Sequence, residues 1–245
     1  MSVDTTSDSW RFIARATGHR LNRRTAAVLI GAVLGCGIVG AVVVSRLTTH
    51  AVQSELFTVA LRAFSRAPSV RIRGSTMLDG SVVELDVVAG AQTGGGTVAV
   101  GPAACQVVFD GPTLYVDASA LTWQELGEGS DVPALADRWL STSLETRPFS
   151  TFGEFVSTTA FASLLGTTPP LVEGSPMRFH GARVIPLRST DGGGMTIYVT
   201  TSRVPSLVAE EGPAGWINFD EYGSARAPLV PTGAVAISSL GPIPG

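Results

Sequence analysis

The stretch Ser69–Val88, SVRIRGSTMLDGSVVELDVV, carries the clearest structural pattern in the chain. Apolar residues alternate with arginines and small polar residues in its first half, and mainly with acidic residues in its second half. Asp79-Gly80 between the halves is typical of a tight hairpin turn. Since alternation places one set of side chains on each face of a strand, the stretch predicts two antiparallel strands with one face buried and one in water.

The same reasoning extends outward in both directions. Before the hairpin, apolar residues recur every three or four positions from Thr49 to Ala67-Pro68, which predicts an amphipathic helix. After it, the patterns predict strands at 97–100, 106–110 and 113–117, helices at 119–126, 133–138 and 151–165, and strands at 177–180, 183–188, 195–200, 206–210 and 216–222. The chain lacks the long crossover units of a parallel sheet. We therefore expect an α+β fold, a curved antiparallel sheet with helices packed on one face.

An uncharged apolar run from Thr25 to Ser45 precedes this region. About 21 residues at roughly 1.5 Å each span on the order of 31 Å, the thickness of a bilayer core. Five arginines precede the run and Arg46 follows it. This charge distribution predicts a single-pass transmembrane helix with a cytoplasmic N-terminus and the rest of the chain outside the cell membrane.

Cys36 leaves the fate of this segment open. Val33-Leu34-Gly35-Cys36 loosely resembles the site at which a lipoprotein is cut and acylated. An intact anchor, a lipidated Cys36 and cleavage to a soluble product are three alternatives. The intact anchor fits best, because leucine stands where a small residue is usual and the chain stays apolar after the cysteine.

Four regions are expected: a cytoplasmic tail (1–24), a transmembrane helix (25–47), an extracytoplasmic domain (48–226) and a Pro/Gly-rich tail (227–245). All 17 basic residues are arginine, and the composition is typical of high-GC coding, as in actinobacteria. Residues 48–245 contain 11 arginines and 18 acidic residues, a formal charge near −7. This excess of negative charge argues against a nucleic-acid partner.

The sequence offers little for catalysis or cofactors. His50 and His180 lie outside the predicted span, and neither has the spacing of a zinc ligand. The triple glycines at 94–96 and 192–194 join strands to strands, which favours hairpin turns over phosphate loops. Cys105 has no basic neighbour in sequence to activate it. We expect no enzyme activity, no metal and no cofactor.

The order of several short motifs resembles the LppX/LprAFG lipoprotein family of the actinobacterial envelope and, more distantly, LolA-type lipoprotein carriers. The resemblance covers roughly residues 50–226 and rests on Ala67–Gly74, Val83–Asp86, Asp110-Gly111 before Leu114–Val116, Asp137–Trp139, His180-Gly181 before Val184–Leu187, Ile197–Val199 with Pro205–Leu207, and Phe219–Tyr222. It implies an incomplete barrel wrapped about helices, with an apolar cavity that holds acyl chains, and a carrier of lipid or lipoglycan. Members are usually tethered by a lipidated cysteine, and this chain departs from them there.

The leading hypothesis is a non-enzymatic, membrane-anchored domain that binds a lipid or another hydrophobic ligand. For the lining of its cavity we name Phe155, Phe161, Leu164 and Leu165, which the predicted helix at 151–165 carries. The same residues also suit an ordinary core. The alternative is an envelope scaffold domain with a solid core, no ligand and a protein partner.

Overall fold

The computed structural model describes residues 54–240, apart from 79–80, 126–131, 145 and 147–148. The expected cytoplasmic tail, the expected transmembrane helix and Cys36 lie outside the described residues. Within the described part, every helix is too short or too polar to cross a bilayer.

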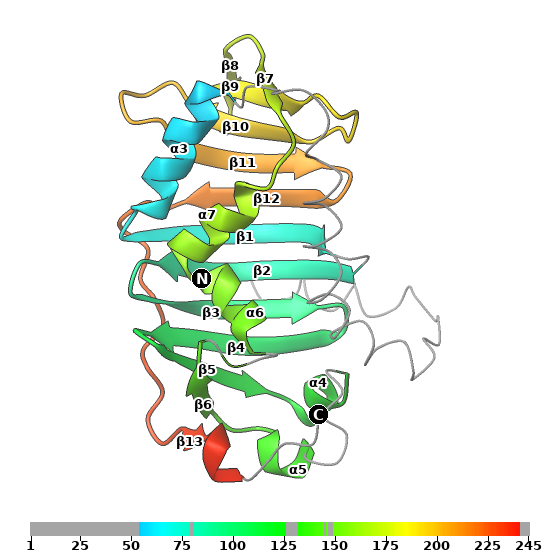
Figure 1. Cartoon of the computed structure of the whole chain (residues 1–245), viewed down its shortest axis with the longest axis vertical. Helices are drawn as coiled ribbons and strands as arrows, with labels where there is room; N and C mark the ends of the chain where they lie inside the picture. The colour runs from blue at the N-terminus through cyan, green and yellow to red at the C-terminus, as the bar shows by residue number, and fades with distance from the viewer. Residues whose placement is uncertain (1–53, 79–80, 126–131, 145, 147–148, 241–245) are drawn as a thin grey trace, which may run out of the picture.

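One sheet organises the described part of the chain (Figure 1). It has 13 strands in the order β13-β6-β5-β4-β3-β2-β1-β12-β11-β10-β9-β7, with β8 also paired to β9. Neighbouring strands are antiparallel except for the parallel pair β6 and β13. The strands are β1 (Ser69–Leu78), β2 (Ser81–Gly90), β3 (Thr93–Val100), β4 (Ala103–Asp110), β5 (Thr113–Ala118), β6 (Leu140–Ser143), β7 (Leu171–Glu173), β8 (Met177–Phe179), β9 (Ala182–Ser189), β10 (Thr196–Thr200), β11 (Leu207–Gly212), β12 (Gly215–Asp220) and β13 (Val235–Ala236).

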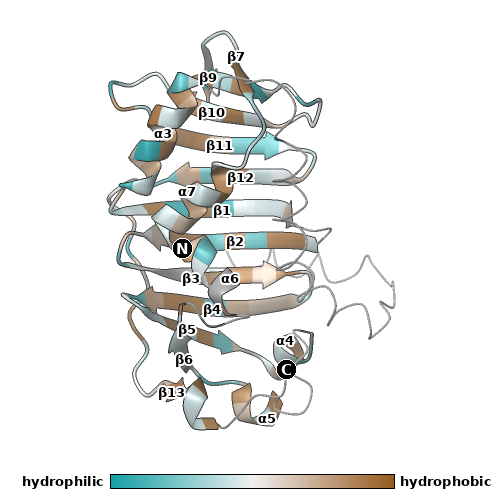
Figure 2. Cartoon of the chain, in the orientation of Figure 1, coloured by the Kyte–Doolittle hydropathy of each residue, from teal (hydrophilic) through white to brown (hydrophobic). Residues whose placement is uncertain are grey.

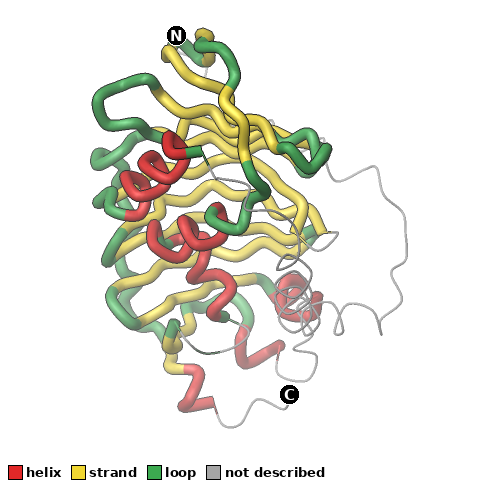
Figure 3. Tube along the Cα trace, turned by 45° about the horizontal axis from the view of Figure 1, so that its top comes forward, coloured by secondary structure: helices red, strands yellow, loops and turns green. Residues whose placement is uncertain are grey.

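Three helices lie along one face of the sheet, which we call the inner face; the opposite side is the outer face (Figure 3). They are α3 (Glu55–Ser65), α6 (Ser150–Val156) and α7 (Thr158–Leu165). The shorter α4 (Ala120–Glu125), α5 (Val132–Leu135) and η4 (Ile237–Leu240) lie toward the β6 and β13 end (Figure 1). An open, mainly antiparallel sheet with helices on its inner face confirms the expected α+β class, and it is consistent with an incomplete barrel.

The first hairpin forms where the sequence predicts it. Strands β1 and β2 pair over ten residues each, from Ser69 opposite Gly90 to Leu78 opposite Ser81. Ile72 and Val87 face each other across this pair and are fully buried. Figure 2 shows hydrophobic segments along β2, β4 and β10. The alternation therefore supplies the inner face with the side chains that the helices cover.

Helix α3 begins at Glu55, directly after its capping residue Ser54. The earlier part of the expected helix, 49–53, lies outside the described residues. The Ser54 Oγ accepts a hydrogen bond from the backbone N–H of Phe57, at 3.4 Å. Such a cap satisfies one of the free N–H groups of the first turn. Phe57, Ala60 and Phe64 then form a fully buried stripe.

The prediction of one continuous helix at 151–165 is wrong, because the chain breaks it at Ser157. This residue is extended, with φ −108° and ψ 125°, and its side chain caps α7 at the N–H of Ala160. Its backbone also bridges to Gly90 on β2. Gly94 on β3 permits this approach, since a Cβ there would clash with the Val156 carbonyl oxygen. At Ser157 the contact with the sheet therefore interrupts the helix that the periodicity of the sequence predicts.

The segment after β12 pairs with the sheet at the edge formed by β6. Val235 and Ala236 pair with β6 as strand β13, and Ile237 is buried in the core. The expected tail at 227–245 therefore contributes a strand within its described residues. Strands β6 and β7 are also additions to the predicted elements, and both are too short for a pattern to reveal.

Candidate ligand-binding site

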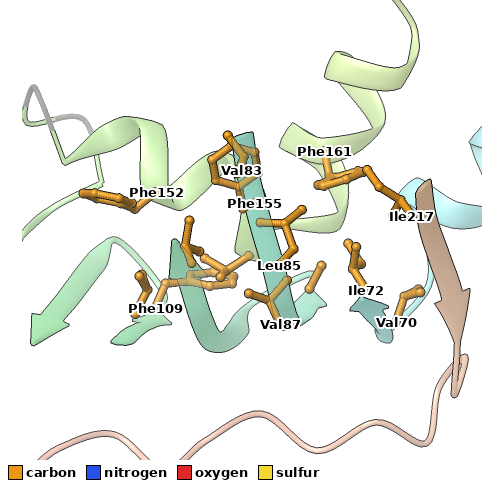
Figure 4. Packing of buried hydrophobic residues seen from close by; sticks show 14 of the residues in the cluster. Val70, Ile72, Val83, Leu85, Val87, Phe109, Phe152, Phe155, Phe161 and Ile217 are labelled. Atoms are coloured by element: carbon orange, nitrogen blue, oxygen red, sulfur yellow. The ribbon is translucent and has the colours of Figure 1, made fainter. Parts of the chain in front are cut away.

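Side chains fill the centre of the inner face (Figure 4). Phe64 on α3 meets Phe161 on α7 and Phe219 on β12, with ring centroids 5.9 and 5.6 Å apart. Phe161 and Phe219 meet edge to face at 6.0 Å. Centroid distances of 4.5–7 Å are those of well-packed aromatic pairs. The middle of the sheet is therefore a solid core.

The four residues named from the sequence as cavity lining separate into two groups. Phe155, Phe161 and Leu165 are buried in this core, and Leu164 is 37% exposed on the other side of α7. None of the four lines either of the two pockets described below. Their part in ligand binding stays a proposal.

A pocket of about 210 Å³ opens beside the core, where β1, β10, β11 and β12 end. We call it the inner pocket. Met195, Ile217 and the turn between β11 and β12 form most of its wall, and the lining consists of Thr76, Gly193, Met195, Glu210, Gly212, Pro213, Ala214, Gly215, Trp216 and Ile217. Ile217 belongs to the buried core and Met195 packs against it. The inner pocket is thus an apolar extension of the core toward solvent.

Glu210 is the one carboxyl group in the wall of this pocket. It stands directly opposite Ile217 on β12 and Ile197 on β10, both of which are buried. A β-bulge between Tyr198 and Val199 explains its position, since the extra residue on β11 shifts the alternation by one and turns Glu210 to the inner face.

Burial raises the pKa of the Glu210 carboxyl above its usual range, because the charged form loses its hydration. The group has no hydrogen-bond or ion-pair partner among the described residues. When protonated it can donate a hydrogen bond to an oxygen of a bound molecule. Sequence reasoning missed Glu210, because a bulge leaves no signal in the pattern and simple alternation turns this residue to water.

A second pocket, of about 410 Å³, lies on the outer face. Its floor is the outer side of β1 to β4, where Gly95 has no side chain, and Trp139 and the segment 226–229 form its rim. The ion pair of Arg71 and Asp86 stands in its wall, with N and O 2.5 Å apart. Polar groups dominate this lining, which suits water or a polar molecule better than a hydrocarbon chain.

Cys105 and His180 are the cysteine and the histidine of the described residues. Burial raises the pKa of the Cys105 thiol to about 12, and its Sγ points to the Val98 carbonyl oxygen at 3.5 Å. A thiol held neutral in this way is a poor nucleophile. The His180 ring stacks on Phe179 at 4.2 Å. In the part of the chain that the structure describes, His, Cys, Asp and Glu form no group of three that could hold a metal ion.

The geometry can now be compared with known proteins. No family model matches the chain, and no curated protein sequence does. Among solved structures it is similar to the crystal structure of LprF from Mycobacterium bovis, with a TM-score of 0.47, 13% identity, and coverage of 73% of this chain and 95% of that chain. LprF bears the name of the LppX/LprAFG group that the sequence motifs resemble. At this identity and TM-score the likeness assigns neither a family nor a ligand to this chain.

Proposed function

We propose that the domain binds a lipid or another hydrophobic molecule at the inner pocket and that it is not an enzyme. The observation that carries this proposal is the pocket itself, an apolar hollow next to the core. Its wall holds a single carboxyl group, which has no partner among the described residues. Ligand sites typically combine an apolar lining with few polar groups that orient the ligand. The exposed side of Leu164 is a further candidate contact, as the sequence suggests.

The volume limits what the pocket can hold. About 210 Å³ corresponds to roughly seven water-sized volumes of about 30 Å³ each. A short acyl segment fits, whereas a complete long chain needs more room. Met195 is an unbranched, adaptable side chain in the wall, so its movement is the simplest way to enlarge the pocket. The ligand would place its hydrocarbon end against Ile217 and a polar oxygen near Glu210.

The test is lipid extraction combined with a pocket-filling variant. Mass spectrometry of an organic extract of the purified chain should show a bound lipid. A fluorescent fatty acid should bind to the delipidated chain, and the extracted lipid should displace it. Ala214→Trp places a large ring in the pocket mouth and should weaken fatty-acid binding at least tenfold. Ala91→Trp is the matched control, because both alanines are exposed in hairpin turns. An extract without lipid, together with equal binding by both variants, would contradict the proposal.

The solid centre of the inner face favours a second candidate, a scaffold domain that binds an envelope protein. Crosslinking in membranes should then recover a protein partner, and delipidation should leave that crosslink unchanged. A crosslink that disappears with the lipid would favour the first candidate instead.

We also propose that the predicted span at 25–47 anchors the domain outside the cell membrane. The support is the length of the apolar run and the arginines before it. Alkaline phosphatase fused after Gly245 should be active, since it folds outside the cytoplasm. If the phosphatase fusion is inactive, and a reporter that fluoresces only in the cytoplasm is fluorescent when fused at the same position, the domain lies inside the cell.

A further inference from the structure

The edge of the sheet formed by β7, β8 and β9 differs in charge from the rest of the chain. Residues 171–206 contain four arginines and two carboxylates, Glu173 and Asp191, a formal charge of +2, whereas the whole chain has −3. The four are Arg178, Arg183, Arg188 and Arg203, and all are exposed. We call these arginines, with the exposed apolar residues around them, the basic edge.

Two of these arginines face each other. Arg178 on β8 and Arg183 on β9 are direct partners in the strand register. Like charges at such positions repel and weaken the sheet. Neither arginine makes an ion pair among the described residues. Glu173 instead accepts a hydrogen bond from the Ser54 Oγ, and Asp191 accepts bonds from Ser189 and Gly193. The edge thus keeps a net positive charge, and Arg178 and Arg183 have no ion-pair partner among the described residues.

Large apolar side chains stand between the arginines. Val172 on β7, Met177 on β8 and Val204 after β10 are 55%, 42% and 66% exposed. Arginines beside exposed aliphatic groups suit a bilayer interface, where the guanidinium meets phosphate and the aliphatic side chain meets the acyl boundary.

The chain leading out of the structure also ends at this edge. Helix α3 starts beside β9 and β10 in Figure 1, and its cap Ser54 is bonded to Glu173 of β7 at 2.8 Å. Six residues, 48–53, separate Ser54 from the predicted span. At about 3.5 Å per residue they reach at most roughly 25 Å. The β13 end lies on the order of 50 Å away, at about 4.8 Å per strand.

We propose that the basic edge rests on the anionic surface of the bilayer that holds the predicted span. The strands then run along the membrane plane, and the sheet rises from it strand by strand toward β13. Phosphate groups of the lipids neutralise Arg178 and Arg183, which removes their repulsion. Val172, Met177 and Val204 enter the headgroup region.

The experiment uses the full chain in nanodiscs of phosphatidylcholine, with or without 30% phosphatidylglycerol. Hydrogen exchange of amides in 171–184 should be slower in the anionic discs, and 0.5 M salt should abolish the difference by screening. Arg178→Gln with Arg183→Gln removes both charges and their repulsion, so it does not weaken the fold. It should reduce the surface-bound population about 25-fold, since each arginine near an anionic surface contributes about five-fold.

The control is Arg138→Gln with Arg226→Gln, two exposed arginines outside the basic edge, which should leave the protection intact. Ala214→Trp should also leave the protection from hydrogen exchange intact. Because this variant affects only ligand binding, failure of the ligand proposal can be distinguished from failure of the membrane proposal. Equal exchange in the two kinds of disc would overturn the proposal. So would equal effects of the two arginine pairs.

Discussion

Phe64 is the residue on which the contact between helices and sheet depends most. Its ring meets Phe161, Phe219 and also Tyr222, whose centroid is 6.3 Å away, and it is fully buried. Removal of a buried ring leaves a cavity and loses these pairs. Phe64→Ala should lower the free energy of unfolding by about 3–5 kcal/mol in urea titrations. Val59→Ala on the same helix, where the side chain is 39% exposed, should change it far less.

Glu210 contributes to the pH dependence of stability, as does Glu154, whose pKa burial also raises. Burial raises its pKa in the folded state, so the folded protein holds this proton to higher pH than the unfolded chain. Stability is therefore lost as pH rises from about 4.3, the usual value for glutamate, through the raised pKa. Glu210→Gln removes this loss.

We expect Glu210→Gln to raise Tm at pH 7.5 relative to the parent and to change it little at pH 4, where the parent carboxyl is also neutral. Thermal unfolding at the two values of pH measures this. An equal change in Tm at both would show that the loss of charge is not the cause.

At the scale of elements, the break between α6 and α7 fixes how the helices meet the sheet. The backbone of Ser157 reaches β2, and the Val156 carbonyl lies over Gly94. Gly94→Ala adds one methyl group at this contact. Because backbone atoms oppose it and cannot turn aside, we expect a loss of about 1–3 kcal/mol, the usual cost of overpacking. Circular dichroism during urea unfolding would measure it.

Gly193→Ala is the control for that variant. The three atoms nearest to a Cβ at Gly193 all belong to the side chain of Asp191, in an exposed loop. The two substitutions add the same methyl group, so equal effects would mean that the helices do not press on β3 as described.

For the whole molecule, the sheet should be most stable in its middle. Strands β1 to β4 have eight or ten residues each and lie under α6 and α7, whereas β13 has two and β7 has three. Opening of an end strand breaks few bonds and exposes little apolar surface. Hydrogen exchange should therefore be slowest in β1–β4 and faster by at least tenfold in β13. Uniform protection along the sheet would contradict this gradient.

Most strands of the two meanders, the helix before them and the α+β class can be predicted from the sequence alone. The expected hairpin turn at 94–96 is wrong, because these glycines lie inside β3 and pair with β4. Alternation and helical periodicity are local properties, so Ser69–Val88 shows its hairpin without reference to the rest of the chain. The predicted span at 25–47 and Cys36 are likewise sequence statements, on residues outside the described part.

Tertiary contacts account for the break at Ser157, the inward orientation of Glu210 and the addition of β13 to the sheet. Each depends on a partner distant in sequence: Gly90 for Ser157, the register of β10 for Glu210, and β6 for the C-terminal segment. The filling of the inner face by Phe64, Phe161 and Phe219 is of the same kind. A periodic pattern shows that a face is apolar, but the volumes that meet across it decide whether side chains or a ligand occupy the space.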